Sequence, residues 1–281
     1  MAFNLQTFIT RTITATVFVA VLLTCICVNF YTLAGLFFVV SVWGLHEFYQ
    51  ISIKLKAQPD IFLGISLAIL LYTGVFLSLL GNNFQVFSEL VIYGAVFVSS
   101  LIFIRSLFLN IENTIQNIAF TFLGIIYAVV PFLLLLKTTF LNSNSQFSFD
   151  AVLGMILLIW ANDASAYIVG SFFGKHKLYE RISPGKTWEG TIGAAILTIL
   201  CAIPVHYWFP EIKMWSWMVI AFIVAFFGTV GDLIESMLKR QAGIKDSGKI
   251  MPGHGGILDR FDSLIFVSPI VYLFFRVVLN Q

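Results

Sequence analysis

The chain has 281 residues, of which 59% are hydrophobic and 11% are charged, and its mean hydropathy is +0.95. Soluble domains carry about 25% charged residues, so this composition excludes a single soluble globule. The formal net charge of +2 provides no basic field for a polyanion, which excludes a disordered or nucleic-acid-binding chain. The membrane is the remaining solvent.

Uncharged stretches long enough to cross a membrane follow one another along the chain, since a transmembrane helix needs roughly 20 mostly apolar residues. A polar step at Asn29 divides the first stretch into two spans, and His46, next to Glu47, is interpreted as an interfacial polar group. The sequence predicts an all-α polytopic integral membrane protein with about nine transmembrane helices. They are expected at residues 12–28, 31–45, 61–80, 90–104, 115–136, 151–173, 191–209, 214–231 and 263–279.

Lysine and arginine residues predict the orientation, because they accumulate in short cytoplasmic loops. With the N-terminus inside, thirteen of the 16 fall on the cytoplasmic side, while Lys137, Lys213 and Arg276 fall outside. We therefore expect a cytoplasmic N-terminus. The first apolar run is followed by no small-residue cleavage site, so we interpret it as a helix and not as a signal peptide.

The charges are concentrated in two clusters on the predicted cytoplasmic side. Residues 160–190 hold seven and residues 231–262 hold ten of the 30 charges. We therefore divide the chain functionally into residues 1–150, with about five spans, and residues 151–281, a catalytic transmembrane region with two cytoplasmic motif clusters. Orientation accounts for the lysines but not for the aspartates, because acidic residues contribute little to it.

Three aspartates of the second cluster are predicted to converge. Asp232 ends one span, and Asp259 and Asp262 lie three residues apart at the entrance to the last span. Carboxylates that converge at membrane depth persist only with cations beside them. Hard oxygen ligands suit Mg²⁺ better than zinc, and a second cation is left open. The alternative is a set of interfacial ion pairs.

The surroundings of these aspartates are typical of a phosphate site. Basic residues available to neutralise phosphate are Lys239, Arg240, Lys245, Lys249 and Arg260. Gly255 and Gly256, next to His254, would let backbone N–H groups approach phosphate oxygens, although the alternative is a simple tight turn. Glu235 and Asp246 are expected to pair with neighbouring lysines instead.

The first cluster contributes an intramembrane carboxylate and a phosphate-like turn. Asp163, next to Asn162, lies within a predicted span and is a functional candidate, with a buried polar clasp as the alternative. A turn is predicted at residues 183–185, beginning at Ser183, after which Lys186 would meet an anion near a helix N-terminus. The alternative is an ordinary capped helix start with Glu189 in its first turn.

The second cluster resembles the signature of the phosphatidate cytidylyltransferase, or CDP-diacylglycerol synthase, family. The matching run is Ser236-x-x-Lys239-Arg240-x-x-x-x-Lys245-Asp246-x-x-x-x-x-Pro252-x-His254-Gly255-Gly256-x-x-Asp259-Arg260-x-Asp262. Two upstream blocks of the family resemble Asn162-Asp163-x-x-Ala166-Tyr167 and Ser183-Pro184-x-Lys186-Thr187-x-Glu189-Gly190. Met251 is a mild departure from the branched or aromatic residue usual in the family. The likeness is close over the C-terminal half.

The resemblance implies cytidylyl transfer from CTP to phosphatidate, which gives CDP-diacylglycerol and pyrophosphate for phospholipid biosynthesis and requires Mg²⁺. It also implies a homodimer in the membrane lipid. By motif position, Asp232, Asp259 and Asp262 correspond to metal-site carboxylates. With Lys239 and Arg240 they form the predicted catalytic set. The predicted substrate-binding set is Lys245, His254, Gly255, Gly256, Arg260, Ser183, Lys186, Asn162 and Asp163.

Two other functions remain open from the sequence. A CTP-dependent kinase of a lipid alcohol would need a general base, for which Asp163 or Asp232 is the candidate. A transporter of a phosphorylated metabolite would use the same charges, but the clusters lie at one membrane face and no duplicated halves are apparent. Because a long hydrophilic N-terminal extension is lacking, we expect a bacterial inner membrane protein whose active site faces the cytoplasm.

Overall fold

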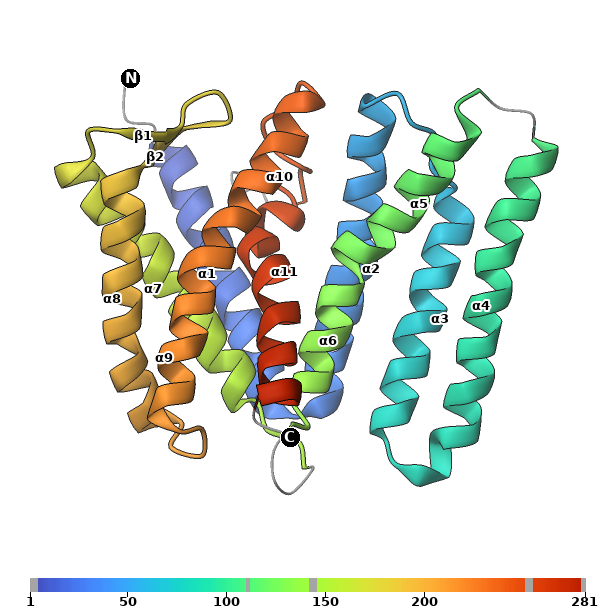
Figure 1. Ribbon diagram of the computed structural model, residues 1–281, viewed down its shortest axis with the longest axis horizontal. Helices are drawn as coiled ribbons and strands as arrows, with labels where there is room; N and C mark the ends of the chain where they lie inside the picture. Colours follow the sequence, from blue (N-terminus) through green and yellow to red (C-terminus); the bar gives the residue numbers. More distant parts are fainter. Residues whose placement is uncertain (1–4, 110–111, 142–145, 251–254, 279–281) are drawn as a thin grey trace. The chain divides into compact units, whose positions relative to one another are not determined.

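The computed structural model describes residues 5–109, 112–141, 146–250 and 255–278 (Figure 1). The chain forms two compact units. The N-terminal unit comprises Met1–Lys137 and Gln241–Arg260, and the C-terminal unit comprises Thr138–Arg240 and Phe261–Gln281. The second charged cluster is thus divided between the units. The functional boundary expected at residue 150 describes motif content and not this division.

The first part of the N-terminal unit is built mainly from helices, the last of which ends at the boundary with the C-terminal unit. They are α1 (Leu5–Val28), α2 (Phe30–Lys54), α3 (Ile61–Leu79), the short η1 (Asn82–Phe84), α4 (Gln85–Phe108), α5 (Thr114–Ala128) and α6 (Val130–Thr138). Helices α3 and α4 run side by side, joined by η1 (Figure 1). Tyr49 of α2 donates a hydrogen bond to the carbonyl of Thr121 in α5 at 2.9 Å, and this buried contact ties α2 to α5.

The polar step at Asn29 separates two helices as predicted. Asn29 Oδ1 accepts from Thr32 N at 3.0 Å, and Thr32 Oγ1 accepts from Asn29 N at 3.3 Å. This reciprocal capping box satisfies backbone groups that a helix start leaves without partners. One residue is therefore enough to end α1 and begin α2.

Several predicted spans have different limits in the structure. The fourth, expected at residues 90–104, is α4 (Gln85–Phe108), the eighth, expected at 214–231, continues to Gln241, and the ninth begins at Leu258. The second was expected at residues 31–45, but α2 continues to Lys54, because the charged Glu47 is buried and hydrogen-bonded within the protein. The stretch 115–136 consists of α5 and α6 with a break at Val129. Pro131 follows this break, and proline has no N–H to continue the helical hydrogen bonding.

The C-terminal unit is helical with one small hairpin. Its elements are α7 (Asp150–Phe173), β1 (Lys177–Tyr179), β2 (Ser183–Thr187), α8 (Trp188–Trp208), α9 (Met214–Ile223), the π-helical turn η2 (Val224–Gly228), α10 (Thr229–Gln241), α11 (Leu258–Leu273) and η3 (Phe274–Val278). The boundary between the units falls within the first turn of α11. Helices α7 and α8 run side by side, with the hairpin at one end of the pair (Figure 1).

Helix α9, η2 and α10 form one continuous helical rod of 28 residues, Met214–Gln241. Near its start Trp217 is fully buried, and a Cβ at Gly154 of α7 would overlap its indole ring. This contact fixes α9 against α7. The wider turn η2 then precedes the charged helix α10.

The hairpin corrects one prediction from the sequence. A turn was expected at residues 183–185, but these residues lie in β2, which pairs antiparallel with β1, and the turn lies at residues 180–182. Pro184 is compatible with a strand that has another strand on only one side, because its missing N–H need not enter the pairing. Thr187 then caps α8, its Oγ1 accepting from Gly190 N at 3.2 Å.

The helices are long and apolar enough for a membrane protein. In the described residues, eight helical segments of at least 18 residues have the length and composition to cross a membrane, and Thr12–Val28 is a shorter apolar helix. Long side chains such as Phe108 and Phe172 are largely exposed, as expected of a lipid-facing surface. The prediction of an all-α polytopic membrane protein is confirmed.

Candidate active site

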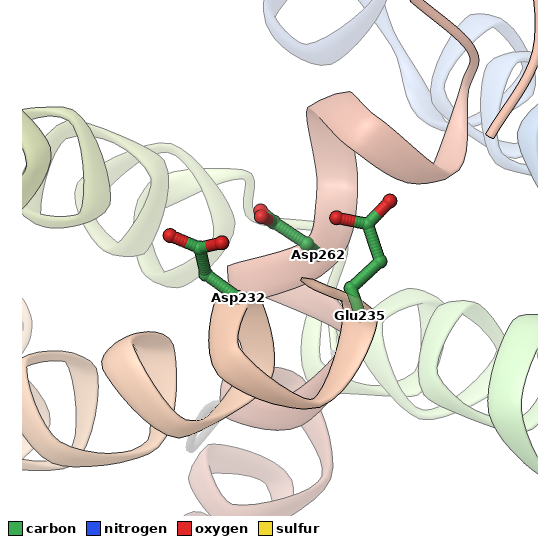
Figure 2. Close-up of side chains that lie close together, drawn as sticks. All are labelled: Asp232, Glu235 and Asp262. Carbon is green, nitrogen blue, oxygen red and sulfur yellow. The ribbon is translucent and has the colours of Figure 1, made fainter. Parts of the chain in front are cut away.

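Three carboxylates from two helices meet in the C-terminal unit. Asp232 and Glu235 belong to α10, and Asp262 belongs to the second turn of α11. One carboxylate oxygen of each lies within 4.8 Å of the others. Figure 2 shows the three side chains close together, Asp232 and Glu235 on one helix and Asp262 on the other. Because like charges repel more strongly away from solvent, this acidic cluster favours a bound cation.

The backbones that carry the acidic cluster approach closely because Gly231 has no side chain. A Cβ at Gly231 would lie 2.6 Å from the carbonyl oxygen of Asp262. Beside this point, Ser263 Oγ donates to the carbonyl oxygen of Gly228 at 3.2 Å, and Gly228 is the last residue of η2. The π-helical turn is therefore fastened to α11 next to the cluster.

Two lysines neutralise part of the charge of the acidic cluster. Lys186 Nζ lies 2.5 Å from Asp232 Oδ2, and Lys239 Nζ lies 2.8 Å from Glu235 Oε2. Ser236 Oγ donates to Asp232 Oδ1 at 3.2 Å. The expected pairing of Glu235 with a neighbouring lysine is confirmed. These ion pairs bring two positive charges to three negative ones, so a divalent cation is compatible with the charge that remains.

A pocket of about 330 Å³ lies beside Asp232. Asn162 and Asp163 of α7, Ser183 and Lys186 of β2, and Asp232 of α10 line its wall. All five were predicted as site residues, and they come from both charged clusters of the sequence. The volume is in the range of small-molecule sites. The pocket therefore joins a polar wall to the acidic cluster through Asp232.

Asn162 is both a pocket residue and an anchor. Its side chain is buried, and its Oδ1 accepts from Thr198 Oγ1 of α8 at 3.2 Å. This contact does not involve Asp163, so the alternative of a polar clasp made by Asp163 stays a prediction. The hydrogen bond from Thr198 to Asn162 holds α7 to α8 at the level of the pocket.

The hairpin that carries Lys186 is fixed by Glu189 at the start of α8. Glu189 Oε2 accepts from Lys175 N at 3.1 Å and from His176 N at 3.2 Å. Its Oε1 lies 2.6 Å from His176 Nδ1. Lys177 Nζ donates to the carbonyl of Pro184 at 2.7 Å across the hairpin. The hairpin is therefore tied at its base, next to the residue that faces Asp232.

Asp259 belongs to the N-terminal unit, where it organises the part of the chain that we call the signature segment, the described residues 241–250 and 255–260. Its Oδ2 accepts from Ser247 N at 2.8 Å, Ser247 Oγ at 3.0 Å and Gly256 N at 2.7 Å. Gly255 has a φ of 81°, and a Cβ there would overlap the Asp259 carboxylate. Asp259 therefore closes the segment in this structure, and its assignment as a metal ligand stays a prediction.

A second carboxylate, Glu47 of α2, contacts the same segment. Glu47 Oε1 accepts from Ile257 N at 3.0 Å, and Oε2 accepts from Leu258 N at 3.0 Å and from Ser247 Oγ at 2.9 Å. Only 4% of Glu47 is exposed. A Cβ at Gly256 would overlap both of its oxygens. The segment is thus built around Glu47.

The remaining predicted residues are placed as follows. Lys245, Lys249 and Arg260 are exposed on the signature segment. Arg240 lies at the end of α10, and its Nε is 3.5 Å from the carbonyl oxygen of Ile182. His254 lies outside the described residues.

Comparison with known proteins identifies the family. The pattern of the Cytidylyltransferase family matches residues 9–278. A phosphatidate cytidylyltransferase of Staphylococcus haemolyticus is 32% identical over 266 residues, which cover 93% of this chain and 96% of that protein. The chain belongs to the cytidylyltransferase family. Proteins of the same name from Staphylococcus saprophyticus and Staphylococcus aureus are 41% and 38% identical over 157 residues, which cover 56% of this chain and 58% of each relative.

Sequence reasoning missed two carboxylates of this cytidylyltransferase. Glu235 was interpreted only as a lysine partner, although its spacing of three residues from Asp232 places both on one helix face. That spacing was the available signal. Glu47 carried no such signal, because it lies 200 residues from Ser247 and its contact exists only in the folded chain.

Proposed function

We propose that this chain transfers the cytidylyl group of CTP to phosphatidate and forms CDP-diacylglycerol and pyrophosphate for phospholipid biosynthesis. The observation that carries the proposal is the full-length likeness to a protein named phosphatidate cytidylyltransferase, with 93% of this chain covered. The pocket beside the acidic cluster supports it, because it combines a lysine and carboxylates in the manner of phosphate and metal sites.

The chemistry determines what the protein must supply. A phosphate oxygen of phosphatidate attacks the α-phosphorus of CTP, a new P–O bond forms, and the bond from the α-phosphorus to the bridging oxygen breaks to release pyrophosphate. The attacking oxygen is already anionic at neutral pH, so no strong general base is needed. The barrier lies in bringing two polyanions together. Catalysis therefore depends on positioning and on charge neutralisation.

The acidic cluster fits Mg²⁺ as the required cation. Its ligand atoms are carboxylate oxygens from Asp232, Glu235 and Asp262, which lie within 4.8 Å of one another. Such hard oxygen ligands, few in number, suit an ion that keeps waters and substrate phosphates in its coordination shell. When bound, Mg²⁺ would reduce the negative charge of the phosphates. Asp259, and a second cation, remain predictions from the sequence.

The lysines of the cluster supply the protein's own positive charge. Lys186 lies at the pocket wall and faces Asp232, so it is placed to exchange this carboxylate for a phosphate oxygen of CTP. Lys239 faces Glu235 in the same way. With Arg240, they would hold the lipid phosphate and the departing pyrophosphate. Ser183 and Asn162 would donate hydrogen bonds to substrate from the pocket wall.

We also propose a membrane setting for this reaction. The distribution of lysine and arginine supports a cytoplasmic N-terminus. The nine predicted helices would then put both charged clusters on the cytoplasmic side. CTP would reach the site from the cytoplasm, while the acyl chains of phosphatidate stay in the inner leaflet. The bacterial relatives support a bacterial inner membrane, and a homodimer is proposed from the family resemblance.

An assay with two differently labelled forms of CTP tests the proposed function. Purified protein in lipid is given phosphatidate and a polyprenol side by side, with CTP labelled at the α- or the γ-phosphate and with Mg²⁺ or a chelator. We expect the α-label to enter lipid only with phosphatidate and only with Mg²⁺. Transfer of the γ-label to the alcohol would identify a kinase instead. No nucleotide turnover by folded protein would favour the transporter.

A further inference from the structure

We propose that Glu47 is a positioning residue for the reaction, which orients the signature segment through the first amides of α11 and through Ser247. The expected change in enzyme kinetics rests on the proposed function. The contacts of Glu47 lie within the N-terminal unit and do not depend on that function. Glu47 lies on α2, outside every motif that predicted the site. All of its described partners belong to the signature segment.

The Glu47 side chain contacts the N-terminal end of α11, and this contact explains why a carboxylate is needed. A helix leaves its first N–H groups without partners in the helix, and these groups carry a partial positive charge. Ile257 N and Leu258 N are such groups, because α11 begins at Leu258. Glu47 accepts from both, one with each oxygen. It therefore caps α11 from a distant part of the chain, and fixes where that helix begins.

Ser247 connects Glu47 to the carboxylate that closes the segment. Its hydroxyl oxygen lies 2.9 Å from Glu47 Oε2 and 3.0 Å from Asp259 Oδ2. A hydroxyl has one proton, so it donates to one carboxylate at a time. Asp259 also accepts from Ser247 N and Gly256 N, so a change at Glu47 alters one of these three contacts, the shared hydroxyl.

The cost of burying Glu47 also argues for a specific role. A buried carboxylate is costly unless hydrogen bonds compensate for the lost water. Glu47 has two backbone donors at 3.0 Å and shares the Ser247 hydroxyl, at 2.9 Å, with Asp259. The surrounding chain is shaped to admit it, since a Cβ at Gly248 or at Gly256 would overlap its oxygens. An apolar side chain here would fill the helix contact without these requirements.

Glu47→Gln is the decisive variant, because it keeps the shape of the side chain while it removes the charge and one acceptor. The control is Glu89→Gln, the same substitution at an exposed position on α4. Hydrogen exchange is measured on metal-free protein for the amides of Ile257 and Leu258. We expect faster exchange in Glu47→Gln by about tenfold to hundredfold, since a hydrogen bond to a charged group contributes roughly 1.5–3 kcal/mol. The control should match the wild type.

Kinetics then separate positioning from a purely structural role. For folded Glu47→Gln we expect kcat/KM for CTP to fall by about tenfold to hundredfold, with the yield of folded protein unchanged. Ser247→Ala, which leaves Glu47 and the amides intact, should show a smaller change in the same direction. If Glu47→Gln fails to fold, the kinetics of Ser247→Ala test the positioning role instead.

Two results would overturn the inference. One is exchange at Ile257 and Leu258 like that of the control. The other is a loss of folded protein with an unchanged KM and kcat in the fraction that folds, which would make Glu47 a structural residue only. The exchange experiment needs no catalysis. Absence of CDP-diacylglycerol formation by the wild type would therefore refute the proposed function without deciding the geometry.

Discussion

The carboxylates of the two units are balanced by different kinds of partner. In the C-terminal unit, Asp232 and Glu235 face the ammonium groups of two lysines. In the N-terminal unit, Glu47 faces two backbone amides and a hydroxyl. A lysine can turn from one anion to another, whereas a backbone amide moves only with its helix. The first arrangement suits an exchange of ligands, and the second suits a fixed frame.

Exposure follows the same difference. The side chains of Lys186 and Asp232 are 24% and 34% exposed, so a substrate phosphate has access to this pair. Glu47 is 4% exposed. Within each unit the exposure matches the kind of partner: the ion pair that a substrate must reach is accessible, and the carboxylate that holds backbone amides is shielded from water. The predictions below alter the two arrangements separately.

The largest effect is expected for Asp262→Asn. This change removes one charge from the acidic cluster and should lower kcat by about 10²–10³-fold, the loss typical when one preorganised electrostatic contact is removed. Thermal stability should be kept or raised, because repulsion among the three carboxylates falls. Activity is measured as CDP-diacylglycerol formation over a range of Mg²⁺ concentrations. Glu211→Gln, which removes one charge at an exposed position outside both charged clusters, is the control, and equal activity of the two variants would contradict the assignment of the cluster.

A smaller effect is expected for Lys186→Met. The side chain keeps its apolar length but loses the ammonium group that faces Asp232. We expect kcat/KM for CTP to fall by about tenfold to hundredfold, because a charge-assisted hydrogen bond contributes roughly 1.5–3 kcal/mol. Most of the change should appear in KM. The control is Lys175→Met, an exposed lysine near the hairpin. If both variants bound CTP equally well, Lys186 would not contact the nucleotide.

The smallest effect is expected for Gly231→Ala. The added methyl group would lie 2.6 Å from the carbonyl oxygen of Asp262, so α10 and α11 must shift. Overpacking of this kind costs about 1–3 kcal/mol. Gly228→Ala is the matched control, because its nearest neighbour would be Ser263 Cβ at 3.6 Å, an ordinary contact. Thermal unfolding in detergent compares the two, and equal midpoints would show that the close approach of these helices is unimportant.

Hydropathy predicted most of the fold, because the membrane requires long apolar helices wherever the chain crosses it. The break at Asn29 was also predictable, since its capping box is local in sequence. The end of the second helix was not. The charge of Glu47 indicated that the helix ends at the membrane interface. In the folded chain Glu47 is hydrogen-bonded to groups such as Leu258 N, and the helix continues past it. The turn in the hairpin was misplaced because Pro184 and Gly185 occur in strands as well as in turns.

The candidate site was partly predictable for a similar reason. Charged residues that lie close together in sequence, such as Asp232 and Lys239, were easy to identify because the chain has few charges. The contact between Lys186 and Asp232 joins residues 46 positions apart, and the two clusters suggested it only as a shared location. The role of Glu47 could not be predicted from the sequence, because nothing near it distinguishes a surface carboxylate from a buried hydrogen-bond acceptor.

The π-helical turn η2 has a consequence for insertions and deletions in this chain. In a regular α-helix each residue advances the rotation by about 100°, so loss of one residue would turn every later side chain to another face. A π-helical turn holds one residue more than an α-helical turn. A related chain shorter by one residue within Val224–Gly228 could close this turn and keep Trp217 and Asp232 on their present faces. Loss of one residue in this turn should therefore change the geometry of the acidic cluster little.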